Sequence, residues 1–391
     1  MGLSHSPSIV TNGLVFCYDM NNVQKSWKGK PTTNLQLPNV IDWSNSATVT
    51  LLAELSPIGT PVYSVTDNNS GSYLASTRSI TVPNDSNTYT ISIYIKKTYG
   101  ATSTRLGFNS GFSGGTTVAY NQRFNSDTGV GTSGSTVDLG SWWRWQFQIT
   151  NNNTGNTTLG CSFYPATGFY DSGDNSAATG TAIVSSVQIE QNTFATPFVN
   201  GSRSNTQAIL DLTNNNTITA TSLTYNSDAT FSFDGTNDQI TTTPISLTDY
   251  TFELFVKATG DSLSGSTGYN TLLGYTGTRR LLYDTSGNLL AQVGSGNIYS
   301  NRICTRNVWN HVAFTYQSSN ITATWYINGS NAGSSSSAAQ GTWNSAIYIG
   351  SYNSVNYWMN GSIANVKIYN RALSAAEVSQ NFAAHRGRYG I

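Results

Sequence analysis

Aromatic side chains set in polar loops are the residues of this chain most suited to binding chemistry. A tyrosine or tryptophan ring can stack on the apolar face of a pyranose while amide side chains hold its hydroxyl groups. The Asn-rich loop YNSVNYWMN, at residues 352–360, carries three such rings. Trp142 is a further candidate because it falls outside the apolar alternation of its strand. The predicted sugar-binding set is Trp142, Tyr269, Tyr275, Tyr299, Tyr352, Tyr357 and Trp358. For each ring, the alternative is burial in a core or at a subunit interface.

Groups that could catalyse hydrolysis are scarce in the sequence. A glycosidase needs two carboxyl groups that flank the scissile bond. The four glutamates lie far apart in the sequence, at Glu54, Glu190, Glu253 and Glu377. The three histidines, His5, His311 and His385, are not accompanied by a nucleophile elbow or a Ser/His/Asp arrangement. The sequence therefore predicts a protein without enzymatic activity.

The chain has an odd number of cysteines, which lie far apart in the sequence at Cys17, Cys161 and Cys304. Each is set in an apolar, strand-like context, which favours a buried free thiol. A zinc site would need closer spacing and more ligands, and a disulfide framework would need more cysteines.

Composition limits the classes of protein to which the chain can belong. A length of 391 residues favours two hydrophobic cores. Charged residues are only 10% of the chain, against about 25% in ordinary globular proteins, so the surface must be mainly uncharged and polar. A formal net charge of zero argues against nucleic-acid binding. No apolar run reaches the roughly 20 residues of a membrane span. The first residues, MGLSHSPSIVTNG, lack the features of a signal peptide, so we expect synthesis in a cytoplasm.

Alternation of apolar and polar residues predicts β-strands throughout, for example at Tyr89–Lys97, Trp143–Thr150, Tyr250–Ala258 and His311–Gln317. In the second of these, the period of two places Trp145 and Phe147 on a buried face and Gln146 on a wet face. One short helix is indicated near the C-terminus, where Ser374 and Glu377 fit a capping box and Gly387 is the expected stop.

The C-terminal half resembles the laminin-G-like (concanavalin-A-like) superfamily. The resemblance rests on FDGTNDQI at residues 233–240, WNHVAFTY at 309–316, WYINGS at 325–330 and the closing IANVKIYNRALSAAEV. The segment GLVFCYDMNN, at residues 13–22, resembles the opening strand of the same sandwich. The resemblance thus implies a discontinuous domain made of residues 1–32 and 204–391.

The interval between these parts, residues 33–203, resembles the carbohydrate-binding-module-like jelly rolls of phage tail proteins. The segments YTISIYIKK, GSWWRWQFQI and VQIEQNTFATPFV carry this resemblance. We therefore expect an all-β protein of two sandwiches, with the second inserted into a surface loop of the first. The ends of the insert, at residues 31–34 and 200–203, should then lie close together.

Calcium is the one metal that the resemblance raises, because some laminin-G and pentraxin relatives bind it at a sandwich edge. The matching positions for two ligands are Asn237 and Asp238. The loop at residues 351–361, where further carboxylates would be expected, contains no Asp or Glu. Calcium prefers six to eight oxygen ligands, so we expect no cofactor, and Asp238 is expected to cap a turn.

These features predict a structural virion protein of a tailed phage, resembling those of cyanobacterial phages. It would sit on the exterior of the particle as a tail fibre, adhesin or appendage and bind host-cell surface polysaccharide without catalysis. The expected partners are other virion proteins and further copies of the chain, with a trimer favoured for this class. One alternative is a purely architectural capsid or tail decoration protein, in which the loop rings would be buried at subunit contacts. A second is a secreted bacterial adhesin or polysaccharide hydrolase, which the missing signal peptide disfavours.

Overall fold

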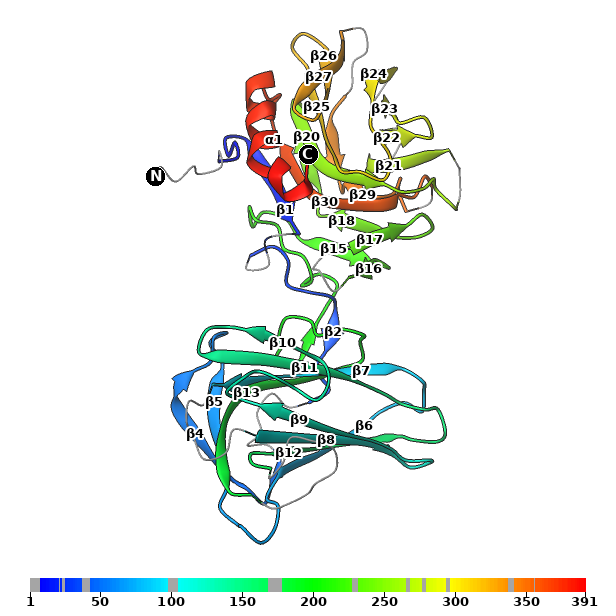
Figure 1. Ribbon diagram of the computed structural model, residues 1–391. Coiled ribbons are helices and arrows are strands. Elements are labelled where there is room, and N and C mark those ends of the chain that lie inside the picture. Colours follow the sequence, from blue (N-terminus) through cyan, green and yellow to red (C-terminus); the bar gives the residue numbers. More distant parts are fainter. Residues whose placement is uncertain are drawn as a thin grey trace. The chain divides into compact units, whose positions relative to one another are not determined.

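The structure is a computed structural model that describes residues 8–20, 22, 25–36, 43–97, 105–167, 178–226, 231–264, 268–275, 279–292, 296–336, 341–354 and 356–391. Within these residues the chain forms thirty strands and one helix, which confirms the predicted all-β class. The chain divides into two compact units (Figure 1). The outer unit combines Met1–Pro31 with Ser204–Ile391, and the inserted unit is Thr32–Arg203.

Two large antiparallel sheets form the outer unit within the described residues. The eight-stranded sheet has the order β16 (Thr224–Tyr225), β17 (Phe231–Asp234), β30 (Asn360–Tyr369), β20 (Tyr250–Ala258), β25 (Asn310–Gln317), β26 (Thr322–Ile327) and β27 (Ser330–Ser335), with β1 (Leu14–Asp19) also paired to β30. The seven-stranded sheet has the order β15 (Ile218–Thr221), β18 (Gln239–Thr242), β29 (Tyr348–Ile349), β21 (Tyr269–Gly274), β22 (Arg280–Asp284), β23 (Asn288–Gln292) and β24 (Asn297–Ile303). A short pair, β19 (Ile245–Leu247) and β28 (Trp343–Ser345), completes the unit.

The N-terminal strand belongs to the sheet of the C-terminal half. On β1, Tyr18 lies opposite Val366 of β30. The main-chain N–H of Cys17 donates to the side chain of Asp211, which is 194 residues away in the sequence. The main-chain oxygen of Cys17 in turn accepts the N–H of Leu212 at 2.7 Å. The chain thus returns to its first strand after the insertion (Figure 1).

Strand β20 is buried on both of its faces. Phe252, Leu254 and Val256 lie in the main core of the outer unit, as a period of two requires. Glu253 and Phe255, on the opposite face, also have no exposed surface. The helix α1 (Ala375–Tyr389) covers that second face, which explains why polar and apolar side chains are equally buried there.

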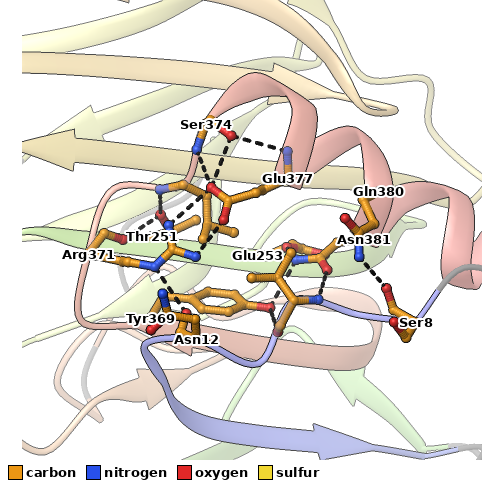
Figure 2. A network of polar contacts seen from close by, with 12 residues as sticks. Ser8, Asn12, Thr251, Glu253, Tyr369, Arg371, Ser374, Glu377, Gln380 and Asn381 are labelled. Atoms are coloured by element: carbon orange, nitrogen blue, oxygen red, sulfur yellow. Dashed lines mark hydrogen bonds and ion pairs between the residues drawn. The ribbon is translucent and has the colours of Figure 1, made fainter.

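Helix α1 begins at the predicted capping box, which the structure confirms (Figure 2). The hydroxyl of Ser374 accepts the N–H of Glu377 at 3.3 Å, and the Glu377 carboxylate accepts the N–H of Ser374 at 2.9 Å. Arg371 donates to both oxygens of the same carboxylate, at 3.0 and 2.6 Å. One glutamate therefore caps the helix and also anchors the preceding turn.

The predicted helix stop at Gly387 is wrong. The helix continues to Tyr389 and ends at Gly390, which has a left-handed φ of 68° that favours glycine. Tyr389 accounts for the extra length, because its ring stacks on Phe255 with the centroids 4.3 Å apart. No helix among the described residues combines the length and apolarity of a membrane span.

A buried polar network fixes the helix to the sheet (Figure 2). Asn381 of the helix donates to Glu253 at 2.7 Å and to the Tyr369 hydroxyl at 2.9 Å, and its oxygen accepts the N–H of Val10. The ammonium group of Lys367 lies 3.2 Å from the same Glu253 carboxylate. Each of these polar groups finds a partner, which is the condition for burying them at low cost.

Within the residues that the structure describes, the inserted unit is a second sandwich. Its six-stranded sheet has the order β10 (Ser135–Asp138), β11 (Trp142–Thr150), β7 (Thr88–Lys96), β13 (Gly180–Glu190), β5 (Pro61–Asp67) and β4 (Thr48–Leu55). Its five-stranded sheet has the order β3 (Ser44–Asn45), β6 (Ser76–Thr81), β12 (Thr158–Tyr164), β8 (Arg105–Ser113) and β9 (Val118–Asn125).

The two ends of the inserted unit meet, as the sequence predicts. They form a small antiparallel pair of β2 (Thr32–Thr33) and β14 (Ser202–Arg203). The core of this unit follows the alternation on β11, where Trp145 and Phe147 are buried and Gln148 is exposed.

Candidate functional site

Three of the predicted rings form a chain of contacts in the outer unit, and two of them lie beside Arg280. Tyr269 and Tyr357 meet edge to face, with their centroids 5.7 Å apart. The rings of Tyr352 and Tyr357 are 6.3 Å apart. The guanidinium carbon of Arg280 lies 4.6 Å from the centroid of each of these two rings. We call Tyr269, Arg280, Tyr352 and Tyr357 the tyrosine–arginine cluster.

The loop from β29 to β30 brings the cluster together. Tyr269 of β21 lies opposite Asp284, and Arg280 of the antiparallel strand β22 lies opposite Gly274, so these two residues are at opposite ends of the strand pair. Tyr352 and Tyr357 lie in the connection from β29 to β30. The cluster therefore combines two adjacent strands with one loop that is distant in the sequence.

Gly350 fixes the point where this loop leaves the sheet. Its φ of 83° is left-handed, and a Cβ there would stand 2.3 Å from the ring of Phe233, so only glycine fits. The main-chain oxygen of Gly350 accepts the N–H of Met359 at 2.8 Å. The loop therefore closes on the residue from which it departs.

Backbone hydrogen bonds hold the two loop rings in place. Tyr352 and Asn356 exchange main-chain bonds of 3.0 and 3.4 Å. The carbonyl oxygen of Tyr357 accepts the N–H of Thr271 on β21 at 2.8 Å. Tyr357 has a φ of 52°, which is uncommon for an aromatic residue. Such strain persists where the surroundings determine the backbone, and it often marks functional positions.

The cluster offers both ring surface and unused hydrogen-bond donors. All four side chains are half-buried. Arg280 Nε donates to Gln292 Oε1. Within the described residues, its two Nη nitrogens and the hydroxyls of the three tyrosines make no hydrogen bond. Cation–π contact of about 0.5–2 kcal/mol keeps the guanidinium between the rings. A hydroxyl-rich ligand would find planar surfaces beside free donors.

Trp142, by contrast, is not available to a ligand, since only 4% of it is exposed. It packs with Val62 and Tyr94 in a second apolar cluster on the far face of the six-stranded sheet. The prediction for Trp142 is wrong because this sheet has apolar groups on both faces, so a residue outside the alternation of one strand is still buried.

Two further predicted rings are also buried. Tyr275 is 5% exposed, packs on Trp343 with the centroids 5.2 Å apart, and hydrogen-bonds Asn344 through its hydroxyl. Trp358 is 6% exposed, although it follows Tyr357 directly. Burial removes both rings from the sugar-binding set.

Tyr299 is 51% exposed on β24, at the edge of the seven-stranded sheet. Within the described residues it makes no ring contact with the cluster.

Arg280 is a residue of the candidate site that the sequence interpretation did not include. The feature of the sequence that could have pointed to Arg280 is its charge. Cationic residues are rare in this chain, and the pair Arg279–Arg280 directly precedes an apolar segment.

The predicted calcium positions do not fit a calcium ion. Asp238 is buried, and its Oδ2 accepts the N–H of Asp234 at 2.8 Å, so it caps a turn. Asn237 is exposed. The described part of the chain contains no group of three histidine, cysteine or acidic residues that could hold a metal. Asn237 and Asp238 together offer too few oxygen atoms for calcium, which prefers six to eight oxygen ligands.

Each of the four glutamates has a structural partner. Glu54 pairs with Lys96 at 2.6 Å. Glu190 accepts the N–H of Thr196 at 2.8 Å in the core of the inserted unit. Glu253 and Glu377 hold the helix, as described above. His311 and His385 are buried beside that helix, and His5 lies outside the described residues.

All three cysteines are buried free thiols, as the sequence predicts. Burial is the main cause that raises the pKa of the Cys17, Cys161 and Cys304 thiols, each to about 12. None of them is an activated nucleophile, because that role requires a lowered pKa.

The chain is distantly similar to several solved structures. The binding domain of Paraclostridial Mosquitocidal Protein 1 is 19% identical, with a TM-score of 0.35, over 44% of this chain and 49% of that one. The Botulinum Neurotoxin Type G Receptor Binding Domain is 15% identical, with a TM-score of 0.36, over 44% and 48%. Domain 4 of AbnA, an extracellular arabinanase from Geobacillus stearothermophilus, in complex with arabinotriose, is 20% identical, with a TM-score of 0.36, over 46% and 93%. The chain spans about half the length of the two toxin domains.

No curated protein matches the chain. One family model does, and it covers residues 234–379, which include the whole tyrosine–arginine cluster. These residues form most of both sheets of the outer unit. The family model describes the Concanavalin A-like lectin/glucanases superfamily, and the fold of this part of the chain is concanavalin-A-like.

Proposed function

We propose that the outer unit binds glycans without catalysis through the tyrosine–arginine cluster. The observation that carries the proposal is the placement of Arg280 between the rings of Tyr352 and Tyr357, with donors left over on all three side chains. Ring faces suit the apolar side of a pyranose, and the donors suit its hydroxyl groups. The matching family takes its name from lectins as well as glucanases, which supports a binding function.

The way in which the glutamates are used supports binding without hydrolysis. A glycosidase needs two available carboxyl groups about 5–10 Å apart. Glu54 and Glu377 are paired with cations, and Glu190 and Glu253 are buried within hydrogen-bond networks. None of these four belongs to the cluster, so a sugar held there would meet no glutamate.

The biological setting we propose is the exterior of a tailed-phage virion, where the protein acts as a tail fibre, adhesin or appendage on host-surface polysaccharide. A surface with few charges and many Ser, Thr and Asn residues supports this setting, since it binds through hydrogen bonds and remains soluble. The partners would be other virion proteins and further copies of this chain, in a trimer.

Two measurements test this proposal. An array of bacterial surface polysaccharides probed with the full chain should show retention of at least one glycan, with no release of sugar from it. Antibodies against the chain should label the exterior of intact particles. Retention without particle labelling would contradict the virion setting, and labelling without retention would contradict glycan binding.

A purely architectural role is the second candidate. It is favoured by the edge strand β4, where Leu51 and Leu55 are 57% and 63% exposed. Exposed leucines on an edge strand suit contact with a neighbouring subunit. This role predicts that no glycan is retained on the array and that Leu51→Lys releases the chain from the particle.

A further inference from the structure

The charge of Arg280 has no anionic partner among the residues that the structure describes. Its Nε donates to the amide oxygen of Gln292, which lies opposite it on β23. Its other contacts are the rings of Tyr352 and Tyr357. The ion pairs of the described residues all involve other cations. A half-buried guanidinium with neutral contacts is partly desolvated without a compensating charge, and an anion would supply that charge.

The sequence beside the cluster also lacks acidic residues. Four short segments next to its strands and loop lie outside the described residues, at 265–267, 276–278, 293–295 and 355. They contain no Asp or Glu. The chain therefore offers Arg280 no carboxylate from its immediate neighbours in the sequence.

The hydrogen bond to Gln292 decides how an anion can approach. Arginine holds a carboxylate with two parallel N–H groups, and Nε is already engaged here. Within the described part of the chain, both Nη nitrogens are without a hydrogen bond. A carboxylate would therefore bind end-on, across the two Nη nitrogens, next to the rings of Tyr352 and Tyr357. Gln292 and the two rings hold the guanidinium in place, which lowers the entropic cost of this contact.

Asp284 lies on the same strand as Arg280 but is too distant to neutralise it. Leu281 and Tyr283 belong to the main core, so the alternation of β22 turns Arg280 and Asp284 to the other face. Four residues separate them, or about 13 Å at the usual rise of about 3.3 Å per residue. This exceeds the screening length of about 8 Å at physiological ionic strength.

The Asp284 carboxylate has a structural role of its own. It accepts the N–H groups of Ser286 and Asn288, at 2.9 and 2.8 Å, and so caps the turn after β22. Tyr269 lies opposite Asp284 on β21. One end of the cluster is therefore beside a carboxylate and the other holds a cation, which places an anionic ligand group at the Arg280 end.

We propose that the cluster selects acidic polysaccharides, with the carboxylate of a uronic acid unit on the two Nη nitrogens of Arg280. The rings of Tyr352 and Tyr357 contact the sugar that carries this carboxylate, and the polymer continues toward Tyr269. This inference rests on the glycan binding proposed above and names the class of glycan. A neutral polymer lacks the group that compensates Arg280 and binds more weakly.

The test compares each polysaccharide with its own carboxyl-reduced form, in which the uronic acids have become neutral hexoses. Both forms of every bacterial surface polysaccharide are placed on one array and probed with the full chain. A uronic-acid polymer should bind at least about tenfold more tightly than its reduced form, as the loss of a charge-assisted contact predicts.

The outcomes separate this inference from glycan binding itself. Retention of neutral polymers alone, or equal affinity for the native and reduced forms, would overturn the selection of acidic glycans and leave glycan binding intact. Retention of no polymer would contradict glycan binding, and the inference would fall with it.

Substitutions assign the carboxylate to Arg280. Arg280→Gln should bind the native and reduced forms equally, because the partner of the carboxylate is gone. Arg302→Gln is the matched control, since it removes an exposed cation from β24 of the same sheet and should keep the wild-type ratio. Arg280→Lys keeps the charge without the fork and should give a smaller ratio than the wild type, which serves as the test if Arg280→Gln does not fold.

Two results with these variants would contradict the assignment. A ratio that persists in folded Arg280→Gln would place the carboxylate elsewhere. A ratio that falls equally in Arg302→Gln would show non-specific attraction to positive charge.

Discussion

Lys367 Nζ lies 3.2 Å from Glu253 Oε1, between neighbouring strands β30 and β20, and neither side chain has any exposed surface. Burial by itself raises the pKa of Glu253, but the Lys367 cation and the hydrogen bonds from His311 and Asn381 outweigh it and lower that pKa to about 2. Glu253 also accepts a hydrogen bond from Asn381 of helix α1 (Figure 2), so the ion pair belongs to the contact between the sheet and that helix.

Lys367→Met should destabilise the outer unit by about 3–5 kcal/mol, because it leaves a buried carboxylate without its cation. The double variant Glu253→Leu with Lys367→Met should lose less than Lys367→Met alone. Lys96→Met is the control, since it breaks a half-exposed pair and should cost about 1 kcal/mol or less. Urea unfolding measures all three free energies. A double variant less stable than Lys367→Met would contradict the account.

His385 should make stability depend on pH. Burial, helped by the Lys367 cation, lowers its pKa from 6.5 to about 4, although Asp19 acts in the opposite direction. The unfolded chain therefore binds a proton between pH 6.5 and about 4 that the folded chain does not. The free energy of unfolding should be level above this window and fall on acidification through it, by up to roughly 3 kcal/mol. His385→Gln should remove the fall, and an unchanged slope in this variant would refute the assignment.

Asp238 should oppose folding at high pH. Burial raises its pKa from 3.8 to about 7. Its stabilising, protonated form is therefore lost as the pH rises through about 7, and Asp238→Asn should be more stable than the wild type above that pH, by roughly 2 kcal/mol. Added calcium should leave the thermal midpoint of the wild type unchanged, and chelation should not affect glycan retention. A midpoint that rises with calcium and no longer does so in Asp238→Asn would instead establish a metal site.

The three cysteines should be inert in the folded protein. Their thiols are buried, and burial raises each pKa to about 12, so almost no thiolate is present at neutral pH. A thiol reagent should label none of them before unfolding and all three in denaturant. Ser79→Cys, at an exposed position of β6, should add one thiol that reacts at once. Fast labelling of the wild type would contradict the burial of these residues.

Local patterns made part of this structure predictable from the sequence. The capping box of Ser374 and Glu377 needs only residues three apart, and the faces of β11 follow from a period of two. The length of the helix was not predictable in the same way, because the contact of Tyr389 with Phe255 joins elements that are distant in the sequence.

The candidate site depends on strand pairing and on a loop distant in the sequence, neither of which the sequence displays. Tyr352 and Tyr357 could be proposed from residue type, but their partner Arg280 is placed by the pairing of β22 with its neighbours. The burial of Trp142 likewise depends on residues of other strands, which form the apolar cluster on the far face of its sheet.

The most direct test of the central claim is the affinity of the full chain for the polysaccharide that the array retains, measured for three proteins. Tyr352→Ala should bind about tenfold more weakly than the wild type, because it removes one ring from the cluster. Tyr299→Ala removes an equally large, exposed ring from the same sheet outside the cluster and should bind as the wild type does. Equal affinity for Tyr352→Ala and the wild type would contradict glycan binding at this site.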